Sequence, residues 1–213
     1  MPIITVSRMY GSGGSEVAER VAAALGWTLL DNALVDAVAV QLGASRAEVA
    51  AHEERVPSLA ARLADALTLG SAELLTQVAD TTPAFTEGRL LDVTLRVISE
   101  AATQGPVVVV GRGAQAMLAE RADAVHVFCC ATRAALVARA GARLGVDEKR
   151  AARTVDETNR HREQYVRRHW DRAWSAPENY HLCVNTELLG VDGAAALVVR
   201  VARERFGEDG AAP

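Results

Sequence analysis

The chain has 213 residues, of which 50% are hydrophobic and 4% aromatic, and its formal net charge is −4 at pH 7. This length and composition predict one domain, or one domain with an inserted lobe, and the negative charge argues against nucleic-acid binding driven by phosphate neutralisation. No apolar run is long enough to cross a membrane and no secretory signal pattern begins the chain, so we expect a soluble cytoplasmic protein.

The first predicted elements are a strand, a glycine-rich turn and a helix. Residues 3–6 form a short apolar run typical of a buried strand, and an amphipathic helix follows over residues 15–25. The turn between them contains Gly11, Gly13 and Gly14. A strand, a turn and a helix in this order point backbone N–H groups and the positive end of a helix dipole toward an anion. The alternative is a plain strand–helix turn without a ligand.

The turn has the length of a phosphate-binding P-loop but departs from the usual signature G-x-x-x-x-G-K-[ST]. Gly14 stands where that signature has its lysine, and Ser15 follows it. The nearest cation is Arg8, at the start of the same loop. Its long side chain could fold back over bound phosphates, and we hypothesise that it supplies the charge that the lysine would provide.

Four further strands and several helices are predicted along the rest of the chain. Because short apolar strands alternate with helical patterns, we expect an α/β protein with a five-stranded parallel sheet flanked by helices. Ligands of such sheets bind beyond the carboxyl ends of the strands, which places Arg8, the glycine-rich turn, Asp31 and Arg112 at one edge. The further predicted strands cover residues 27–31, 106–110, 124–130 and 180–185, and the further predicted helices cover residues 32–69, 87–104, 114 to about 121, 132–144, 147–169 and 190–206.

Cysteines, histidines and tryptophans are better explained as packing residues than as reactive groups. The sequence contains no Ser-His-Asp or Cys-His nucleophile arrangement, and its three cysteines lack metal-ligand spacing. Trp170 or Trp174 could stack on a base, but packing in the core or in a lid is the preferred interpretation. The residues expected to be buried thiols, core histidines or packed tryptophans are Cys129, Cys130, Cys183, His126, His181, Trp170 and Trp174.

Several segments taken together resemble the cytidylate kinase-like family, relatives of the bacterial cytidylate kinases. They are SRMYGSGG, WTLLD, VVVVGRGA and the run DETNRHREQY leading to NYHLCVNT, and the resemblance extends from residue 3 to about residue 206. It implies a P-loop kinase fold in one domain, residues 1–207, with a helical acceptor-binding lobe at about 32–104, an arginine-rich lid at about 139–174 and a frayed tail at 208–213. It also implies transfer of the γ-phosphoryl group of ATP, with Mg²⁺, to a nucleoside monophosphate, which is CMP or dCMP in the cytidylate kinases.

The resemblance further implies the residues of the two phosphate sites. Arg112 matches the arginine that holds the acceptor phosphate in a Gly-Arg-Asp motif, although Gly113 replaces the aspartate here. Asp31 matches a carboxylate that ends the second strand, where Asn32 follows in place of serine. Asp31 could hold Mg²⁺ through water together with the Ser15 hydroxyl, or it could simply cap a helix. The residues matched to the ATP-phosphate loop are Gly11, Ser12, Gly13, Gly14 and Ser15.

Arg153, Asp156 and Arg160 resemble the Arg/Asp/Arg pattern of the family's lid, where arginines meet the transferring phosphoryl group. The alternative is a solvated basic helix in which these three side chains pair with one another.

Three functions remain open from the sequence. The first is a kinase acting on CMP or dCMP, and the second is the same fold acting on another small acceptor, which the changes at Asn32 and Gly113 favour. The third is a non-catalytic nucleotide-binding or regulatory protein, which the missing lysine at Gly14 favours. We expect a small-molecule nucleotide as partner, and part of residues 32–104 could form a homodimer interface.

Overall fold

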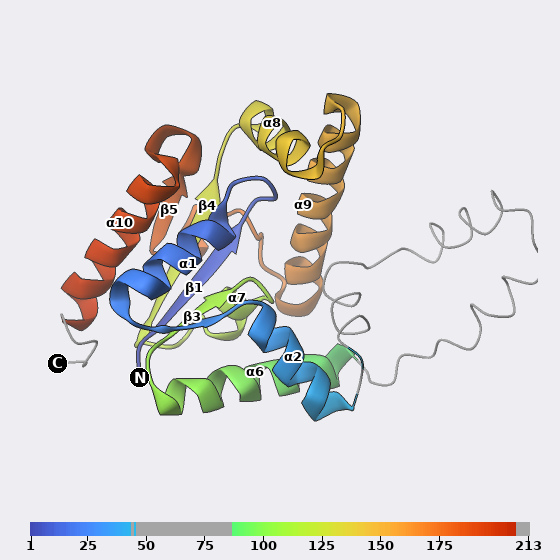
Figure 1. Cartoon of the computed structure of the whole chain (residues 1–213). Helices are drawn as coiled ribbons and strands as arrows, with labels where there is room; N and C mark the ends of the chain where they lie inside the picture. Colours follow the sequence, from blue (N-terminus) through green and yellow to red (C-terminus); the bar gives the residue numbers. More distant parts are fainter. Residues whose placement is uncertain (44, 46–86, 208–213) are drawn as a thin grey trace, which may run out of the picture.

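The computed structural model describes residues 1–43, 45 and 87–207 of the chain (Figure 1). Much of the predicted acceptor lobe, residues 46–69 of the predicted helical region 32–69, and the predicted tail at 208–213 lie outside the described residues. No helix within the described residues has the length and apolar character needed to span a membrane.

The described residues form one parallel sheet of five strands, in the order β2-β3-β1-β4-β5. Every neighbouring pair is parallel, so all five carboxyl ends lie at the same edge. The parallel five-stranded sheet flanked by helices is therefore confirmed. The strands are β1 (Ile3–Arg8), β2 (Thr28–Leu30), β3 (Val107–Val110), β4 (Ala124–Cys130) and β5 (Leu182–Asn185), and the ends of β2 and β5 are one or two residues shorter than predicted.

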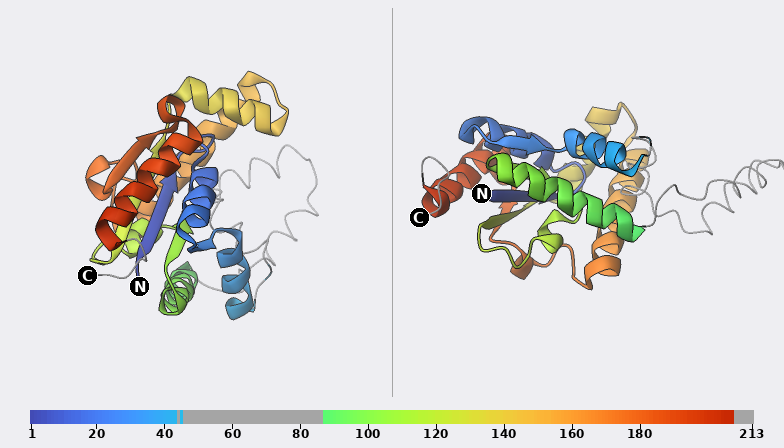
Figure 2. Two further views of the ribbon diagram at one scale, coloured as in Figure 1. Left: turned by 60° about the vertical axis from the view of Figure 1, so that its left-hand side comes forward. Right: turned by 90° about the horizontal axis from the view of Figure 1, so that it is seen from below.

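Helices cover both faces of the sheet and one end of it (Figures 1 and 2). α1 (Gly14–Leu25) and α10 (Thr186–Phe206) pack on one face, and α2 (Asn32–Leu42), α6 (Glu87–Gln104) and the short α7 (Ala114–Met117) pack on the other. α8 (Arg133–Leu144) and α9 (Glu148–Trp170) lie beyond the carboxyl ends of β1 and β4 (Figure 1). A short 3₁₀ turn, η1 (Pro177–Asn179), leads into β5.

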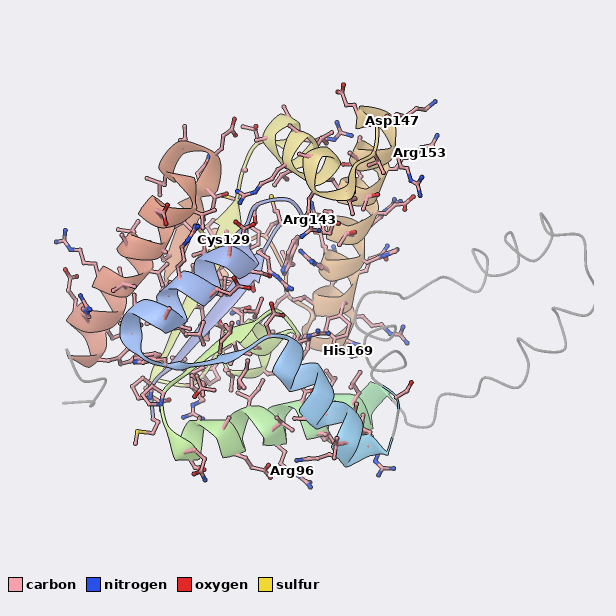
Figure 3. All side chains as sticks on the ribbon, viewed as in Figure 1. Arg96, Cys129, Arg143, Asp147, Arg153 and His169 are labelled. Carbon is pink, nitrogen blue, oxygen red and sulfur yellow. The ribbon has the colours of Figure 1, made fainter. Side chains whose placement is uncertain are left out.

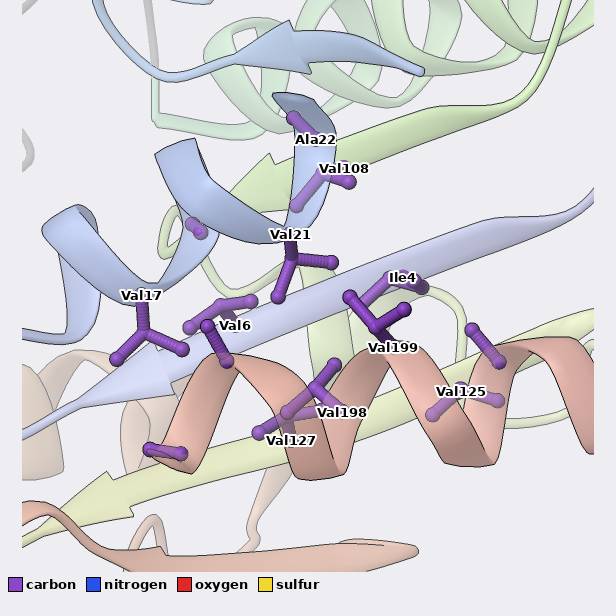
Figure 4. Close-up of a cluster of buried hydrophobic side chains, with 14 of the residues drawn as sticks. Ile4, Val6, Val17, Val21, Ala22, Val108, Val125, Val127, Val198 and Val199 are labelled. Atoms are coloured by element: carbon purple, nitrogen blue, oxygen red, sulfur yellow. The ribbon is translucent and has the colours of Figure 1, made fainter. Parts of the chain in front are cut away.

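The central strands are buried on both faces, which explains their unbroken runs of branched apolar residues. Ile4 and Val6 of β1 point toward α1 and α10, where they meet Val17 and Val198, whereas Ile3 points toward α6 (Figure 4). The four valines of β3 alternate between the two faces in the same way. This double burial makes β1 and β3 a rigid base for the loops that follow them.

Two helix boundaries differ from the prediction for identifiable reasons. α10 begins at Thr186 rather than at residue 190, because the Asn185 side-chain oxygen accepts hydrogen bonds from the backbone N–H groups of Glu187 (3.0 Å) and Leu188 (3.3 Å). Gly190 interrupts the helical conformation with a φ of 67°, which explains why the pattern placed the helix start there.

α7 ends at Met117 rather than near residue 121, because the chain turns after Met117 to lead into β4. In this turn, the Arg121 guanidinium donates two hydrogen bonds to the Asp123 carboxylate, at 2.8 and 2.7 Å. These bonds lower the pKa of Asp123 to about 2.

Burial was predicted incorrectly for two residues near β5. Cys183 and His181 are exposed rather than buried, because β5 pairs only with β4 and forms an edge of the sheet. His126 and Cys129 on β4 are buried as predicted, and burial raises the pKa of the Cys129 thiol to about 12. Cys130, the next residue, points to the opposite face and is half-buried.

Candidate active site

The candidate active site lies at the edge of the sheet where β1 and β3 end side by side. β1 ends at Arg8 and leads into the glycine loop, residues 9–14, at the start of α1. β3 leads into the GRG turn, which consists of Gly111, Arg112 and Gly113. The two segments are directly joined, since the Gly111 N–H donates to the Val6 carbonyl at 3.0 Å.

The glycine loop is held in shape by neighbouring elements. The Ser12 hydroxyl donates to the Met9 carbonyl at 2.8 Å, and the Ser12 carbonyl accepts a 2.6 Å hydrogen bond from the Thr186 hydroxyl of α10. Ser12 is 1% exposed, so its side chain has a structural role within the loop. Gly13 occupies the N-cap position of α1 with a φ of 76°, and no side chain caps the helix there. The first N–H groups of α1 therefore have no side-chain cap, and their binding of an anion stays a prediction of the sequence pattern.

The GRG turn has three successive residues in the left-handed backbone region. The φ angles are 70° for Gly111, 59° for Arg112 and 66° for Gly113. This conformation is accessible to glycine but costs free energy for an arginine, whose Cβ crowds the backbone. Strain of this kind persists only where surrounding contacts hold it, and it is concentrated at functional sites.

Arg8 crosses from one loop to the other through space that two glycines leave open. A Cβ atom at Gly14 would collide with the Arg8 Cβ, and a Cβ atom at Gly111 would collide with Nη1 of the Arg8 guanidinium. The stem of Arg8 therefore lies over Gly14, where the usual signature has its lysine, and its charged end reaches the GRG turn. A longer side chain at either glycine would displace it.

Three arginines line a small pocket between the end of β1, the GRG turn and α9, with a volume of about 60 Å³. They are Arg8, Arg112 and Arg162 of α9, and the Arg162 guanidinium also donates a 2.6 Å hydrogen bond to the Arg8 carbonyl. The described residues that line the pocket include no aspartate or glutamate. Such a lining favours a compact anion, and guanidinium groups match the oxygens of phosphate in geometry and charge.

Aromatic side chains form another part of the pocket wall. The Tyr180 hydroxyl donates to the Trp174 carbonyl at 2.6 Å, and burial raises the pKa of Tyr180 to about 12. Tyr180 is thus a neutral hydrogen-bonding group near pH 7 and not a base. Trp174 is buried against Phe128, as the packing interpretation of this residue predicts.

α8 and α9 cover the outer side of the glycine loop. The Tyr10 N–H donates to the Asn159 side-chain oxygen at 2.7 Å, and the Arg143 guanidinium lies 4.7 Å from the centre of the Tyr10 ring (Figure 3). Arg139 of α8 lies against Gly13, where a Cβ would approach its guanidinium to 2.6 Å, and it forms a 2.9 Å ion pair with Glu16. Both helices are therefore docked on the loop.

Comparison with protein families identifies the chain. The model of the cytidylate kinase-like family matches residues 3–188. The chain belongs to the cytidylate kinase-like family. No curated protein matches it in sequence.

Solved structures share the fold of this family member at low sequence identity. An uncharacterized protein from Eubacterium ventriosum is 21% identical with a TM-score of 0.64, covering 94% of this chain and 98% of its own. TT1252 from Thermus thermophilus is 16% identical with a TM-score of 0.52, covering 94% and 97%. Shikimate kinase from Bacteroides thetaiotaomicron is 14% identical with a TM-score of 0.51, covering 95% and 96%. These similarities support the kinase-type α/β fold and, at this identity, nothing finer.

In this cytidylate kinase-like protein, the residues matched to the family's lid pattern lie on the exposed side of α9. Arg153 and Arg160 are exposed, and Figure 3 shows Arg153 near the end of α9 where the helix begins. The Asp156 carboxylate accepts two hydrogen bonds from Arg133 of α8, at 3.0 and 2.6 Å, which lower its pKa. The structure thus pairs Asp156 with α8 and does not bring these three residues to the pocket.

Two residues of α9 that do reach the site, Asn159 and Arg162, were not singled out from the sequence, where Arg162 counted only as one of seven arginines between residues 150 and 172. They lie on the buried face of the helix, between the buried side chains of Val155 and Val166. The spacing 155, 159, 162 and 166 follows one face of an α-helix, so two polar residues within an apolar stripe were the available signal.

The residues expected to hold Mg²⁺ are compatible with that role. Ser15 is partly exposed in the first turn of α1, and Asp31 follows β2 at the N-cap position of α2. The alternative interpretation of Asp31 as a cap is not supported, since its side chain accepts no capping hydrogen bond. No group of three or more His, Cys, Asp or Glu side chains in the described part of the chain could enclose a metal. Mg²⁺ commonly takes one or two protein oxygens and completes its shell with water and phosphate, which fits Ser15 and Asp31.

Proposed function

We propose that the protein is an ATP-dependent phosphotransferase whose acceptor is a nucleoside monophosphate, with CMP or dCMP as the first candidates. The observation that carries this proposal is the pocket of a cytidylate kinase-like protein in which Arg8, at the end of β1, converges with Arg112 and Arg162. In phosphoryl transfer, the protein acts mainly by positioning the groups and by placing positive charge around the phosphoryl oxygens.

Each part of the site has a distinct role in this proposal. The N–H groups of residues 11–15 bind the ATP phosphates at the start of α1. Arg112 binds the phosphate of the acceptor, whose anionic oxygens suit its planar fork. Arg8 lies between these two places and provides positive charge where the phosphoryl group passes. Ser15 and Asp31 would hold Mg²⁺, which neutralises charge on the phosphates when bound.

The proposed lid is residues 139–174, most of which belong to α8 and α9. This proposal is supported by the contacts of Asn159 with the glycine loop and of Arg162 with the end of β1. A lid excludes water and completes the site around the substrates. We also propose that part of residues 32–104 forms a homodimer interface, which size-exclusion chromatography with light scattering tests.

The decisive experiment measures ATP consumption with Mg²⁺ against every ribo- and deoxynucleoside monophosphate. Turnover with CMP or dCMP alone would establish the proposed function. Turnover with a different acceptor would favour the second candidate, which the replacement of the family aspartate by Gly113 supports. ATP binding in calorimetry without turnover of any acceptor would favour a regulatory nucleotide-binding protein, which the absence of a lysine at Gly14 supports.

A further inference from the structure

Trp170, the last residue of α9, packs directly on Gly113 of the GRG turn. A Cβ atom at Gly113 would collide with Cη2 of the Trp170 ring and would lie 2.6 Å from Cζ3. The indole therefore occupies the space of any side chain at this position, including the aspartate of the Gly-Arg-Asp motif. The end of α9 lies beside α7, which follows the GRG turn (Figure 1).

The Trp170 ring is held in place from behind. The rings of Tyr165 and His169 contact it edge to face, with centroids 5.7 and 5.6 Å away. The ring also packs against a buried cluster that includes Val166 and Trp174. α9 ends at this point because Asp171 adopts a left-handed conformation, with a φ of 51°. Trp170 is thus fixed on a rigid element and does not simply cover an exposed glycine.

Both glycines of the GRG turn are consequently covered by side chains. The Arg8 guanidinium lies against Gly111, and the Trp170 indole lies against Gly113. Between them, Arg112 has a backbone conformation that is unfavourable for a residue with a Cβ. Packing on both sides is what can hold such a conformation in place.

We propose that Trp170 is a positioning residue that holds Arg112 in the conformation that binds the acceptor phosphate. The proposal rests on the function proposed above and adds to it a link between the two sites. α9 contacts the glycine loop through Asn159, the last residue of β1 through Arg162, and the GRG turn through Trp170. A single helix therefore connects the loop that binds ATP with the turn that binds the acceptor.

Kinetics of four variants test this proposal. Trp170→Ala removes the ring, Trp170→Phe keeps an aromatic surface, Gly113→Ala pushes the ring away, and the fourth variant combines Gly113→Ala with Trp170→Ala. Trp170→Ala should raise the KM of the acceptor roughly tenfold, a typical effect of a misplaced binding group, while the KM of ATP stays within about twofold. Trp170→Phe should recover most of this loss. The acceptor KM of the double variant should rise by less than the product of the two single-variant increases. The reason is that the collision occurs only when both the added Cβ at position 113 and the Trp170 ring are present.

Trp27→Phe is the matched control, since Trp27 does not line the pocket and packs against Phe206 of α10, with ring centroids 5.9 Å apart. This control should change neither KM. An unchanged acceptor KM in a Trp170→Ala protein that melts at the wild-type temperature would overturn the proposal. An equal rise in both KM values would also overturn it, since that result indicates general damage.

A binding measurement separates this inference from the proposed function. If wild-type protein transfers no phosphoryl group, the proposed function fails, and calorimetric titration with inorganic phosphate then tests the positioning role. Trp170→Ala should weaken phosphate binding roughly tenfold, and Arg112→Ala should weaken it more, because it removes the binding group itself. Equal phosphate affinity in wild type and Trp170→Ala, or no phosphate binding by wild type, would overturn the inference.

Discussion

The stem of Arg8 fills the space above Gly14, the position at which the usual phosphate-loop signature has its lysine. The would-be Cβ of Gly14 collides with the Arg8 Cβ and lies 3.0 Å from the Arg8 Cγ. A lysine at position 14 is therefore incompatible with the observed position of Arg8. In the proposed function, the charge that faces the phosphates would come from β1 instead of α1, as a planar guanidinium rather than a compact ammonium group.

Arg8→Ala should abolish most phosphoryl transfer. Arginines that stabilise the transferring group contribute roughly 10³–10⁵ in rate, and a steady-state assay with the acceptor found in the screen measures the loss. Arg8→Lys should restore only part of the activity, because it returns the charge without the fork. Arg20→Ala is a suitable control, since Arg20 of α1 does not line the pocket and forms an exposed ion pair with Asp192 of α10. Similar losses in the Arg8 and Arg20 variants would contradict a catalytic role for Arg8.

Gly14→Lys, which restores the usual signature, should lower activity rather than raise it. The new side chain would displace the Arg8 stem, and a collision in a buried position typically costs about 1–3 kcal/mol of stability. Thermal unfolding and the steady-state assay measure both effects. A Gly14→Lys protein that is as stable as wild type and more active would show that Arg8 does not substitute for the lysine.

Arg112→Ala should raise the KM of the acceptor far more than the KM of ATP. The lost charge-assisted hydrogen bonds correspond to about 2–3 kcal/mol, or roughly 30- to 150-fold. Circular dichroism of the variant checks that the protein is folded. If the folded variant has wild-type acceptor kinetics, Arg112 has only a structural role.

Alanine substitutions of the α9 arginines should lower kcat to different extents, according to whether each arginine faces the pocket or the solvent. Arg162→Ala should depress kcat, because its guanidinium lines the pocket and contacts the Arg8 carbonyl. The sequence-based hypothesis also predicts lower kcat for Arg153→Ala and Arg160→Ala, whereas their exposed positions favour small effects. Parallel kcat and melting-temperature measurements on the three variants distinguish the two expectations. A larger kcat loss at Arg160 than at Arg162 would support the sequence-based hypothesis.

The sequence predicted those features that depend on local pattern and missed those that depend on long-range contacts. β1 and β3 were found because burial on both faces requires continuous apolar residues such as Ile4 and Val108. The glycine loop was found because its glycines lie between a strand and a helix. The contacts of Arg162 with Arg8 and of Trp170 with Gly113 join residues that are 154 and about 57 positions apart, and no local pattern encodes such pairs.

The buried His126 should make the protein less stable in mild acid. The pKa of His126 is lowered to about 4, mainly by burial and secondly by electrostatic repulsion from the nearby His181. Its Nδ1 lies 2.8 Å from the Thr5 hydroxyl, and the two histidine rings stack with centroids 5.1 Å apart. The unfolded chain therefore binds a proton at His126 near pH 6.5, whereas the folded chain resists it down to about pH 4.

Stability contributed by the neutral form of His126 is accordingly present above pH 6.5 and is lost as the pH falls from 6.5 to about 4. The free energy of unfolding should fall by about 3 kcal/mol over this range, because each unit of pKa difference corresponds to about 1.4 kcal/mol. Urea unfolding at several values between pH 7 and pH 4 measures this dependence, and His126→Gln should flatten it because glutamine does not titrate. His161→Gln provides the control, since His161 lies on the distant α9. If the free energy of unfolding of His126→Gln falls with pH as steeply as that of wild type, then His126 is not the group responsible.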